Sequence, residues 1–194
     1  MLKGRKIIFR PLEPGDAETL QKWYVDRNFR SGYNEYASVE LESIKQEIAI
    51  SCGNIKDPRV DKVIYMVLRK YDKRPIGLAG LRNIDRRNGN AEIILGIGEK
   101  ELRLAGYGVD ILILLLDLAY YQLGLEKAYY SINDNNGLGL RSAISFGFIS
   151  EGKMRKQVFV EGNYVDLWLL GLLKEEYEAL PIVPKWKKRY SNNT

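Results

Sequence analysis

The chain has 194 residues, 45% of them hydrophobic, which is the size and composition of one medium-sized globular domain with a substantial core. Its 30 lysines and arginines against 25 aspartates and glutamates give a net charge of +5, which suits anionic ligands but does not by itself indicate nucleic-acid binding. There is no histidine and only one cysteine, Cys52, so the composition excludes histidine-dependent catalysis, intramolecular disulfide bonds and histidine or multi-cysteine metal sites. We therefore expect no metal.

The amino-terminal segment lacks the long apolar core of a signal peptide. The most apolar run, Ile111 to Tyr121, contains Asp117 and is much shorter than the ~20 residues that a membrane span needs. We therefore expect a soluble cytoplasmic protein with no membrane partner.

The first part of the chain predicts a strand followed by two helices. Residues 7–12 form the strand, which ends before Pro14-Gly15, and residues 17–28 form a helix with Asp16 as its N-cap. A second helix begins near Ser38 and continues to residue 51. Its expected buried face is formed by Ile44, Ile48 and Ala49.

The rest of the chain predicts three strands, a long helix, a strand, a short helix and a final hairpin. The strands are expected at residues 61–70, 75–85, 91–98, 125–133, 148–160 and 164–173, and the helices in 99–124 and 137–147. Antiparallel runs on both sides of one strand–helix–strand crossover imply a single α/β (mixed α+β) domain with a mixed, mostly antiparallel sheet. We expect this domain to cover residues 1–180 and a polar, basic tail to cover 181–194.

Two glycines separate the strand at 91–98 from the long apolar helix. Successive main-chain N–H groups from Arg103 to Gly108 can converge on one anion there, and the helix dipole and the Arg103 charge favour such a ligand. No Gly-Lys-Ser/Thr follows, and the third glycine of a dinucleotide fingerprint is missing. The residues alone therefore leave two interpretations open, a main-chain phosphate site and a purely structural turn.

The spacing Arg103-x-x-Gly106-x-Gly108 matches the Gln/Arg-x-x-Gly-x-Gly/Ala pyrophosphate motif of the GNAT acetyltransferases. Further along, Asn136, Gly147-Phe148 and Glu151-Gly152 are in register with a signature of the branch that contains the ribosomal-protein N-terminal and the polyamine acetyltransferases. The opening strand and helix and the closing hairpin also resemble that branch, so the resemblance covers residues 7–177.

This resemblance implies a GNAT fold with a splayed central strand pair, flanking helices and acetyl-CoA as cosubstrate. It implies that an amine attacks the acetyl group directly in a ternary complex, with a main-chain N–H polarising the thioester carbonyl. Pantetheine would be bound by the main chain of the strand, and the diphosphate by the turn, with one further contact from the next strand end. The implied cofactor-binding residues are, in that order, Leu95, Gly96 and Ile97; Arg103, Leu104, Ala105, Gly106, Tyr107 and Gly108; and Asn136.

The chain departs from the family pattern at two positions that handle protons. Ala143 occupies the position of the usual tyrosine acid, and Ser131 that of a glutamate base found in some members. Glu92 is our candidate catalytic base, and a glutamate that faces solvent or pairs with an arginine is the alternative. Substitute acids, each of which could equally be a core aromatic, are Tyr107, Tyr129 and Tyr130. Ser142 and Ser145 could support a water or could simply lie on the helix surface.

The predicted function is acetyl-CoA-dependent N-acetylation of a primary amine. Because the usual acid and base side chains are missing, we expect an amine of low pKa, such as a protein N-terminus or an amino sugar. A larger fraction of such an amine is neutral at pH 7. The acceptor is expected between the first two helices and the last hairpin, near the loop that carries Arg27, Arg30, Tyr33, Glu35 and Tyr36, and an ordinary surface loop between helices is the alternative. Glu35, Glu40 and Glu42 are too few to indicate a polyamine site.

Three alternatives remain open. The protein could be a catalytically weak CoA-binding sensor or scaffold, motivated by Ala143, or a small-molecule acetyltransferase for a polyamine, amino sugar or antibiotic. An RNA-associated protein is suggested only by the charge and the basic tail, so a nucleic-acid partner is not expected. The oligomeric state is open, with a homodimer as one option.

Overall fold

The computed structural model describes residues 1–26, 29–30, 38–51, 55, 57–160 and 162–183. Its amino-terminal half contains two short strands, a 3₁₀ turn, two helices and three longer strands. They are β1 (Leu2–Lys3), β2 (Ile7–Pro11), the turn Pro14–Asp16, α1 (Ala17–Val25), α3 (Leu41–Ser51), β3 (Val63–Arg69), β4 (Pro75–Asp85) and β5 (Asn90–Ile97).

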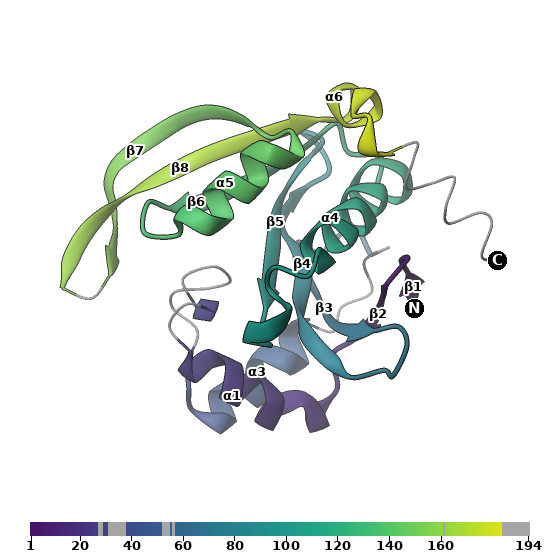
Figure 1. Ribbon diagram of the computed structural model, residues 1–194, viewed down its shortest axis with the longest axis vertical. Coiled ribbons are helices and arrows are strands. Elements are labelled where there is room, and N and C mark those ends of the chain that lie inside the picture. Colours follow the sequence, from purple (N-terminus) through teal and green to yellow (C-terminus); the bar gives the residue numbers. More distant parts are fainter. Residues whose placement is uncertain (27–28, 31–37, 52–54, 56, 161, 184–194) are drawn as a thin grey trace.

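The carboxy-terminal half contains three helices and three strands. They are a 3₁₀ turn Lys100–Leu102, α4 (Tyr107–Asp117) continued by a π-helical turn Leu118–Gln122, β6 (Lys127–Asn133), α5 (Gly137–Phe146), β7 (Ile149–Val160), β8 (Asn163–Leu173) and α6 (Lys174–Ala179). In Figure 1, β7 and β8 form a long curved hairpin that extends away from β2–β5.

The described strands form one eight-stranded sheet in the order β1-β2-β3-β4-β5-β6-β8-β7. Every neighbouring pair is antiparallel except β5 and β6, which are parallel and joined through α4. The predicted mixed, mostly antiparallel sheet is therefore confirmed.

The sheet has a separate hydrophobic core on each face, because successive strand residues point to opposite sides. Ile7 and Phe9 of β2 belong to the same core as apolar residues of α4, α5 and α6, whereas Ile8 between them belongs to the core that includes α1 and α3. The mostly apolar α4 thus lies against the middle of the sheet, and amphipathic α1 and α3 cover the other side.

The parallel strands β5 and β6 separate part-way along their length. They pair from Asn90↔Lys127 only to Glu92↔Tyr129, and beyond that point β5 continues beside β4 while β6 continues beside β8. The splayed strand pair expected from the family resemblance is therefore present. It leaves one main-chain edge of β5 unpaired over residues 93–97.

Most predicted elements are confirmed within a few residues, and the differences involve local partners. Asp16 occupies the predicted N-cap position of α1, but its side chain does not cap the helix: its carboxylate accepts from two Arg10 nitrogens at 2.7 and 3.0 Å and from the Glu13 N–H at 2.8 Å. Ala49 is exposed, and Ser51 is buried on α3 instead. Helix α6 and strand β1 were not predicted.

Among the described residues, no helix combines the length and hydropathy needed to cross a bilayer.

Candidate active site

A cavity of about 1100 Å³ opens where β5 and β6 separate. Its walls come from β5, β6, the turn between β5 and α4, helix α5 and the segment after α6. The polar and charged wall residues are Arg82 of β4, Arg103 of the turn before α4, Tyr130 and Ser131 of β6, and Asn136, Arg141, Ser142 and Ser145 of α5 and its cap. The other walls are formed by main chain and apolar side chains, among them Leu95, Gly96 and Ile97 of β5, Leu104, Gly106 and Gly108 before and within α4, Leu138 and Ala143 of α5, and Leu180, Pro181 and Ile182.

The main chain of β5 presents alternate residues to the cavity. A Cβ at Gly77 of β4 would overlap the Gly96 carbonyl oxygen, so this carbonyl faces β4. By the alternation of strand peptide groups, Leu95 and Ile97 direct their N–H and C=O groups to the opposite, unpaired side. The Ile97 carbonyl there accepts a hydrogen bond from Arg103 Nε at 3.0 Å. The polar groups that a bound chain could meet on this edge thus belong to Leu95 and Ile97 rather than to Gly96.

The turn between β5 and α4 leaves the helix N-terminus without a side-chain cap. Gly106 is the N-cap and has φ +77°, a left-handed conformation that favours glycine. The first four N–H groups of an α-helix have no intrahelical acceptor. Asp110, in the first turn, does not fill this role, because its carboxylate accepts from the Arg5 and Lys6 main-chain N–H groups at 3.3 and 2.7 Å. The turn therefore offers main-chain donors and a helix dipole to an anion.

Gly108 gives this turn the shape of a cradle. Apart from its two chain neighbours and the nearby backbone of α4 itself, no heavy atom lies within 4 Å of where a Cβ would stand, and Gly108 lines the cavity. A side chain here would therefore occupy the space in front of the exposed N–H groups. Ala105 and Tyr107 are not among the cavity-lining residues, and the Tyr107 ring lies 5.4 Å from Lys6 Nζ.

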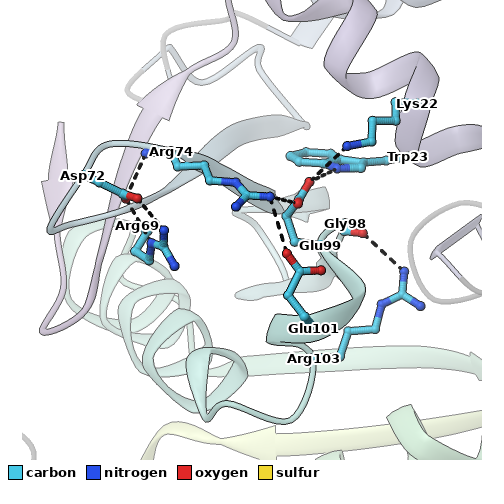
Figure 2. A network of polar contacts seen from close by, with 9 residues as sticks. All are labelled: Lys22, Trp23, Arg69, Asp72, Arg74, Gly98, Glu99, Glu101 and Arg103. Carbon is cyan, nitrogen blue, oxygen red and sulfur yellow. Dashed lines mark hydrogen bonds and ion pairs between the residues drawn. The ribbon is translucent and has the colours of Figure 1, made fainter.

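Arg103 is held by partners on its own side of the cavity. Its Nη2 lies 2.6 Å from an Asp26 carboxylate oxygen at the end of α1, and its other contacts are with the Ile97 and Gly98 carbonyls. Figure 2 shows the Arg103 side chain directed at Gly98. This guanidinium thus ties α1, the end of β5 and the turn before α4 together.

A buried carboxylate, Glu99, holds the start of the same turn. It accepts from Trp23 Nε1 at 3.0 Å and pairs with Arg74, with Lys22 Nζ at 3.9 Å (Figure 2). Burial would raise the pKa of the Glu99 carboxyl, but the Trp23 N–H and the two cations outweigh it and the pKa lies below its ordinary value. A Cβ at Gly98 would overlap the Trp23 indole, so α1 packs directly on the end of β5.

The turn between β6 and α5 is capped by its own side chain. Asn136 Oδ1 accepts the Gly139 N–H at 3.0 Å, and a Cβ at Gly139 would lie only 2.6 Å from Asn136 Nδ2. Arg141 Nη1 lies 3.3 Å from where a Cβ on Gly137 would stand, so this side chain runs back toward the start of α5. Sequence reasoning did not single out Arg141, although its position one turn into a helix beside the predicted Asn136 contact was a signal.

Comparison with known proteins identifies this arrangement. Residues 6–149 match the family model described as "Acetyltransferase (GNAT) domain". The chain belongs to the GNAT acetyltransferase family. It is an acyltransferase that uses acetyl-CoA and acetylates an amine.

Similar proteins carry two kinds of acceptor name. A Bacillus subtilis (strain 168) protein provisionally named a ribosomal N-acetyltransferase is 28% identical over 89% of this chain and 94% of its own. A spermidine N(1)-acetyltransferase of Vibrio cholerae is 26% identical over 89% of this chain and 95% of its own. A crystal structure of a spermidine N-acetyltransferase from Vibrio cholerae with CoA and spermine has a TM-score of 0.76 at 23% identity, covering 89% and 98% of the two chains.

The GNAT cavity fits acetyl-CoA on the evidence of its own shape. The uncapped helix and the open space at Gly108 suit a diphosphate, and the unpaired edge of β5 suits an extended chain with amide groups. Of the residues predicted to bind it, all but Ala105 and Tyr107 line the cavity. The individual roles of all ten stay predictions.

Glu92, the predicted base of this acetyltransferase, is in a buried ion pair. Its two carboxylate oxygens accept from Arg82 at 2.8 and 2.9 Å and from Asn83 Nδ2 at 3.0 Å, and Glu92 is not among the cavity-lining residues. Pairing with an arginine was the alternative stated for this residue. The catalytic role of Glu92 stays a prediction, and these contacts weigh against it.

The proton-handling positions give a mixed outcome. Ala143 and Ser131, the two departures from the family pattern, both line the cavity, as do Ser142 and Ser145. Of the three substitute acids, Tyr130 lines the cavity, and burial raises the pKa of its hydroxyl. Burial, with the Glu92 charge as a smaller cause, also raises the pKa of Tyr129.

The expected acceptor loop lies largely outside the described residues. Arg27, Tyr33, Glu35 and Tyr36 belong to the undescribed part, whereas Phe29 lines the cavity. The predicted domain boundary at residue 180 stays a prediction. Immediately after it, Pro181 and Ile182 line the cavity and Val183 is buried in the core beneath α4.

Proposed function

We propose that this acetyltransferase acts on a primary amine of low pKa, a protein N-terminal α-amine or a small amine such as an amino sugar. One observation carries this proposal. Among the described residues, the cavity wall includes three arginines, Arg82, Arg103 and Arg141, and no aspartate or glutamate. Arg82 and Arg103 are paired with Glu92 and Asp26, so these walls offer a polycationic acceptor no carboxylate, and Arg141 adds a positive charge.

The protonation of the acceptor points the same way. An α-amine with a pKa near 7.7–8 is roughly one-tenth neutral at pH 7, whereas an amine with a pKa near 10.4 is neutral in well under a thousandth of molecules. No histidine is available as a base, and Glu92 is engaged by Arg82 and Asn83. An amine that reaches the site already neutral needs less help from the protein.

In this proposal each wall has one task. Acetyl-CoA supplies an activated acetyl thioester, and the N-terminus of α4 at Gly106–Gly108 holds its diphosphate. Main-chain groups of Leu95 and Ile97 align the pantetheine arm, and an N–H on this edge polarises the thioester carbonyl. Transfer is direct, so the new N–C bond replaces the C–S bond and the amine loses one proton to the thiolate or to solvent.

The test is a thiol-release assay over a panel of amines at equal concentration. We expect the kcat/KM for a peptide with a free N-terminus to exceed those for an N-blocked peptide with an internal lysine and for spermidine by at least tenfold. A preference for lysine or spermidine would contradict the proposal. CoA binding without turnover on any amine would support the sensor alternative instead.

A polyamine acetyltransferase is the second candidate. Its support is the similarity over most of the chain to the spermidine N(1)-acetyltransferase of Vibrio cholerae. Saturable turnover of spermidine with a kcat/KM above that of every α-amine tested would establish this candidate. It would also imply that carboxylates from outside the described walls reach the acceptor.

A further inference from the structure

We infer that Arg141 of α5 is the arginine that binds a phosphate group of coenzyme A, while Arg103 of the family motif acts as a positioning residue for the turn. This inference rests on the use of acetyl-CoA. The family motif places phosphate binding on the turn before α4 alone. In our inference the main chain of that turn and an arginine of α5 share it.

The surroundings of Arg141 carry the first half of the inference. Its exposed side chain lines the cavity, and it forms no ion pair or hydrogen bond with another described residue. Its Nη1 lies beside Gly137, the first residue of α5, where the absence of a side chain leaves room for the guanidinium. A cation that lines a cavity without a carboxylate partner is suited to an anionic ligand.

The surroundings of Arg103 carry the second half. Its guanidinium already satisfies Asp26 at 2.6 Å and the Ile97 carbonyl at 3.0 Å. These contacts use Nε and Nη2, the two donors that form the bidentate edge of a guanidinium, so a phosphate could take that edge only by displacing the Asp26 carboxylate, which is 14% exposed. Its contacts instead hold the end of β5 at a fixed position relative to α1.

Topology brings the two arginines to one ligand. Because β5 and β6 are parallel and each is followed by a helix, α4 and α5 both begin at the same edge of the sheet, beside the point where the strands separate. Gly108 at the start of α4 and Arg141 near the start of α5 line the same cavity. A phosphate held by the α4 amides can therefore receive its arginine contact from the neighbouring helix.

The test measures CoA binding to purified variants by calorimetry. Arg141→Gln should weaken CoA binding roughly 10- to 100-fold, because it removes a charged hydrogen-bond donor. Arg141→Lys keeps the charge and should recover part of that loss. Arg87→Gln is the matched control, since it removes one positive charge from the exposed turn between β4 and β5, away from the cavity. Unchanged CoA affinity in Arg141→Gln would overturn the inference.

Dephospho-CoA identifies which phosphate is involved. If Arg141→Gln weakens CoA but not dephospho-CoA, Arg141 binds the 3′-phosphate. An equal loss with both ligands assigns it to the diphosphate. Either result supports the inference.

Asp26→Asn tests the role of Arg103. If Arg103 is a positioning residue, Asp26→Asn and Arg103→Gln should both weaken CoA binding several-fold and both lower the thermal unfolding midpoint. If Arg103 binds phosphate directly, releasing it from Asp26 should leave CoA binding unchanged or tighter, which would contradict the positioning role. Failure of wild-type protein to bind CoA would be a failure of the cosubstrate assignment, and is thus distinguishable from a failure confined to these variants.

Discussion

The two turns that lead from the parallel strands into α4 and α5 use their residues in opposite ways. After β5, the helix N-terminus has no side-chain cap, and the nearby Arg103 is tied to Asp26. After β6, Asn136 caps the helix, and Arg141 has no carboxylate partner among the described residues. In the first turn the main-chain N–H groups are uncapped and the arginine is already paired. In the second turn a main-chain N–H is capped and the arginine has no carboxylate partner among the described residues.

This difference shows how an anion site can be assembled from two incomplete halves. An uncapped helix N-terminus offers directional N–H donors with a partial charge of about +0.5, which is weak for a ligand that carries several negative charges. A guanidinium carries a full positive charge, but its long side chain has to be held in position by the element that carries it. Placing the two on adjacent helices that begin at one sheet edge combines direction and charge in a single cavity.

The largest effect is expected from filling the cradle at the start of α4. Gly108→Leu places a side chain in the space in front of the free amides, so CoA affinity should fall at least ~100-fold, equivalent to about 2.7 kcal/mol of binding free energy. Because the position has open space and an unstrained backbone, the thermal unfolding midpoint should stay within a few degrees of wild type. Calorimetry with CoA and a thermal unfolding scan measure the two quantities.

A matched glycine controls for the substitution itself. Gly15, in the 3₁₀ turn before α1, also has no heavy atom within 4 Å of its missing Cβ, and Gly15→Leu should leave CoA affinity intact. Gly106→Trp is a poorer test, because φ +77° would strain any side chain. Wild-type CoA affinity in Gly108→Leu would contradict the cradle.

A smaller effect is expected from uncapping α5. Asn136→Ala removes the acceptor for the Gly139 N–H and should lower the free energy of unfolding by about 1 kcal/mol. Asn136→Asp keeps a capping oxygen and should recover that stability, but its negative charge should weaken CoA binding. Chemical denaturation and CoA titration separate the two quantities. If Asn136→Ala weakens CoA binding strongly at unchanged stability, Asn136 is mainly a ligand contact.

The smallest effect is expected from Glu99, which fixes the β5 turn and has no buried counterpart in the β6 turn. Its pKa is depressed in the folded protein, so its contribution to stability is present above the ordinary value of 4.5 and is lost as pH falls through the folded value. The acid-induced loss of stability should therefore be shallower in Glu99→Gln than in wild type. Glu101→Gln removes a 61%-exposed carboxylate near the same Arg74 and serves as the control. Identical acid profiles for wild type and Glu99→Gln would contradict this role.

The element order, the glycine turn and the family motif could all be predicted from the sequence. Hydrophobic periodicity and glycine positions are local signals, and they reflect backbone geometry that the nearest few residues determine. The strands around β5 and the turn at Gly106 and Gly108 follow from such signals, whereas Asn136 was predicted from the family resemblance as a cofactor contact and its capping role was not. Together with the family resemblance, these local signals led to the prediction that a CoA diphosphate binds at this turn.

The partners of the charged residues were decided by the tertiary structure alone. Arg103 pairs with Asp26, which lies 77 positions earlier in the chain, and Glu92 of β5 pairs with Arg82 of the neighbouring strand β4. Arg141 lines a cavity that opens because β5 and β6 separate. No local pattern encodes these outcomes, because an ion pair depends on which side chains the fold brings within a few ångströms of each other. The sequence thus determined where the main chain offers a site, and packing decided which charges are available to complete it.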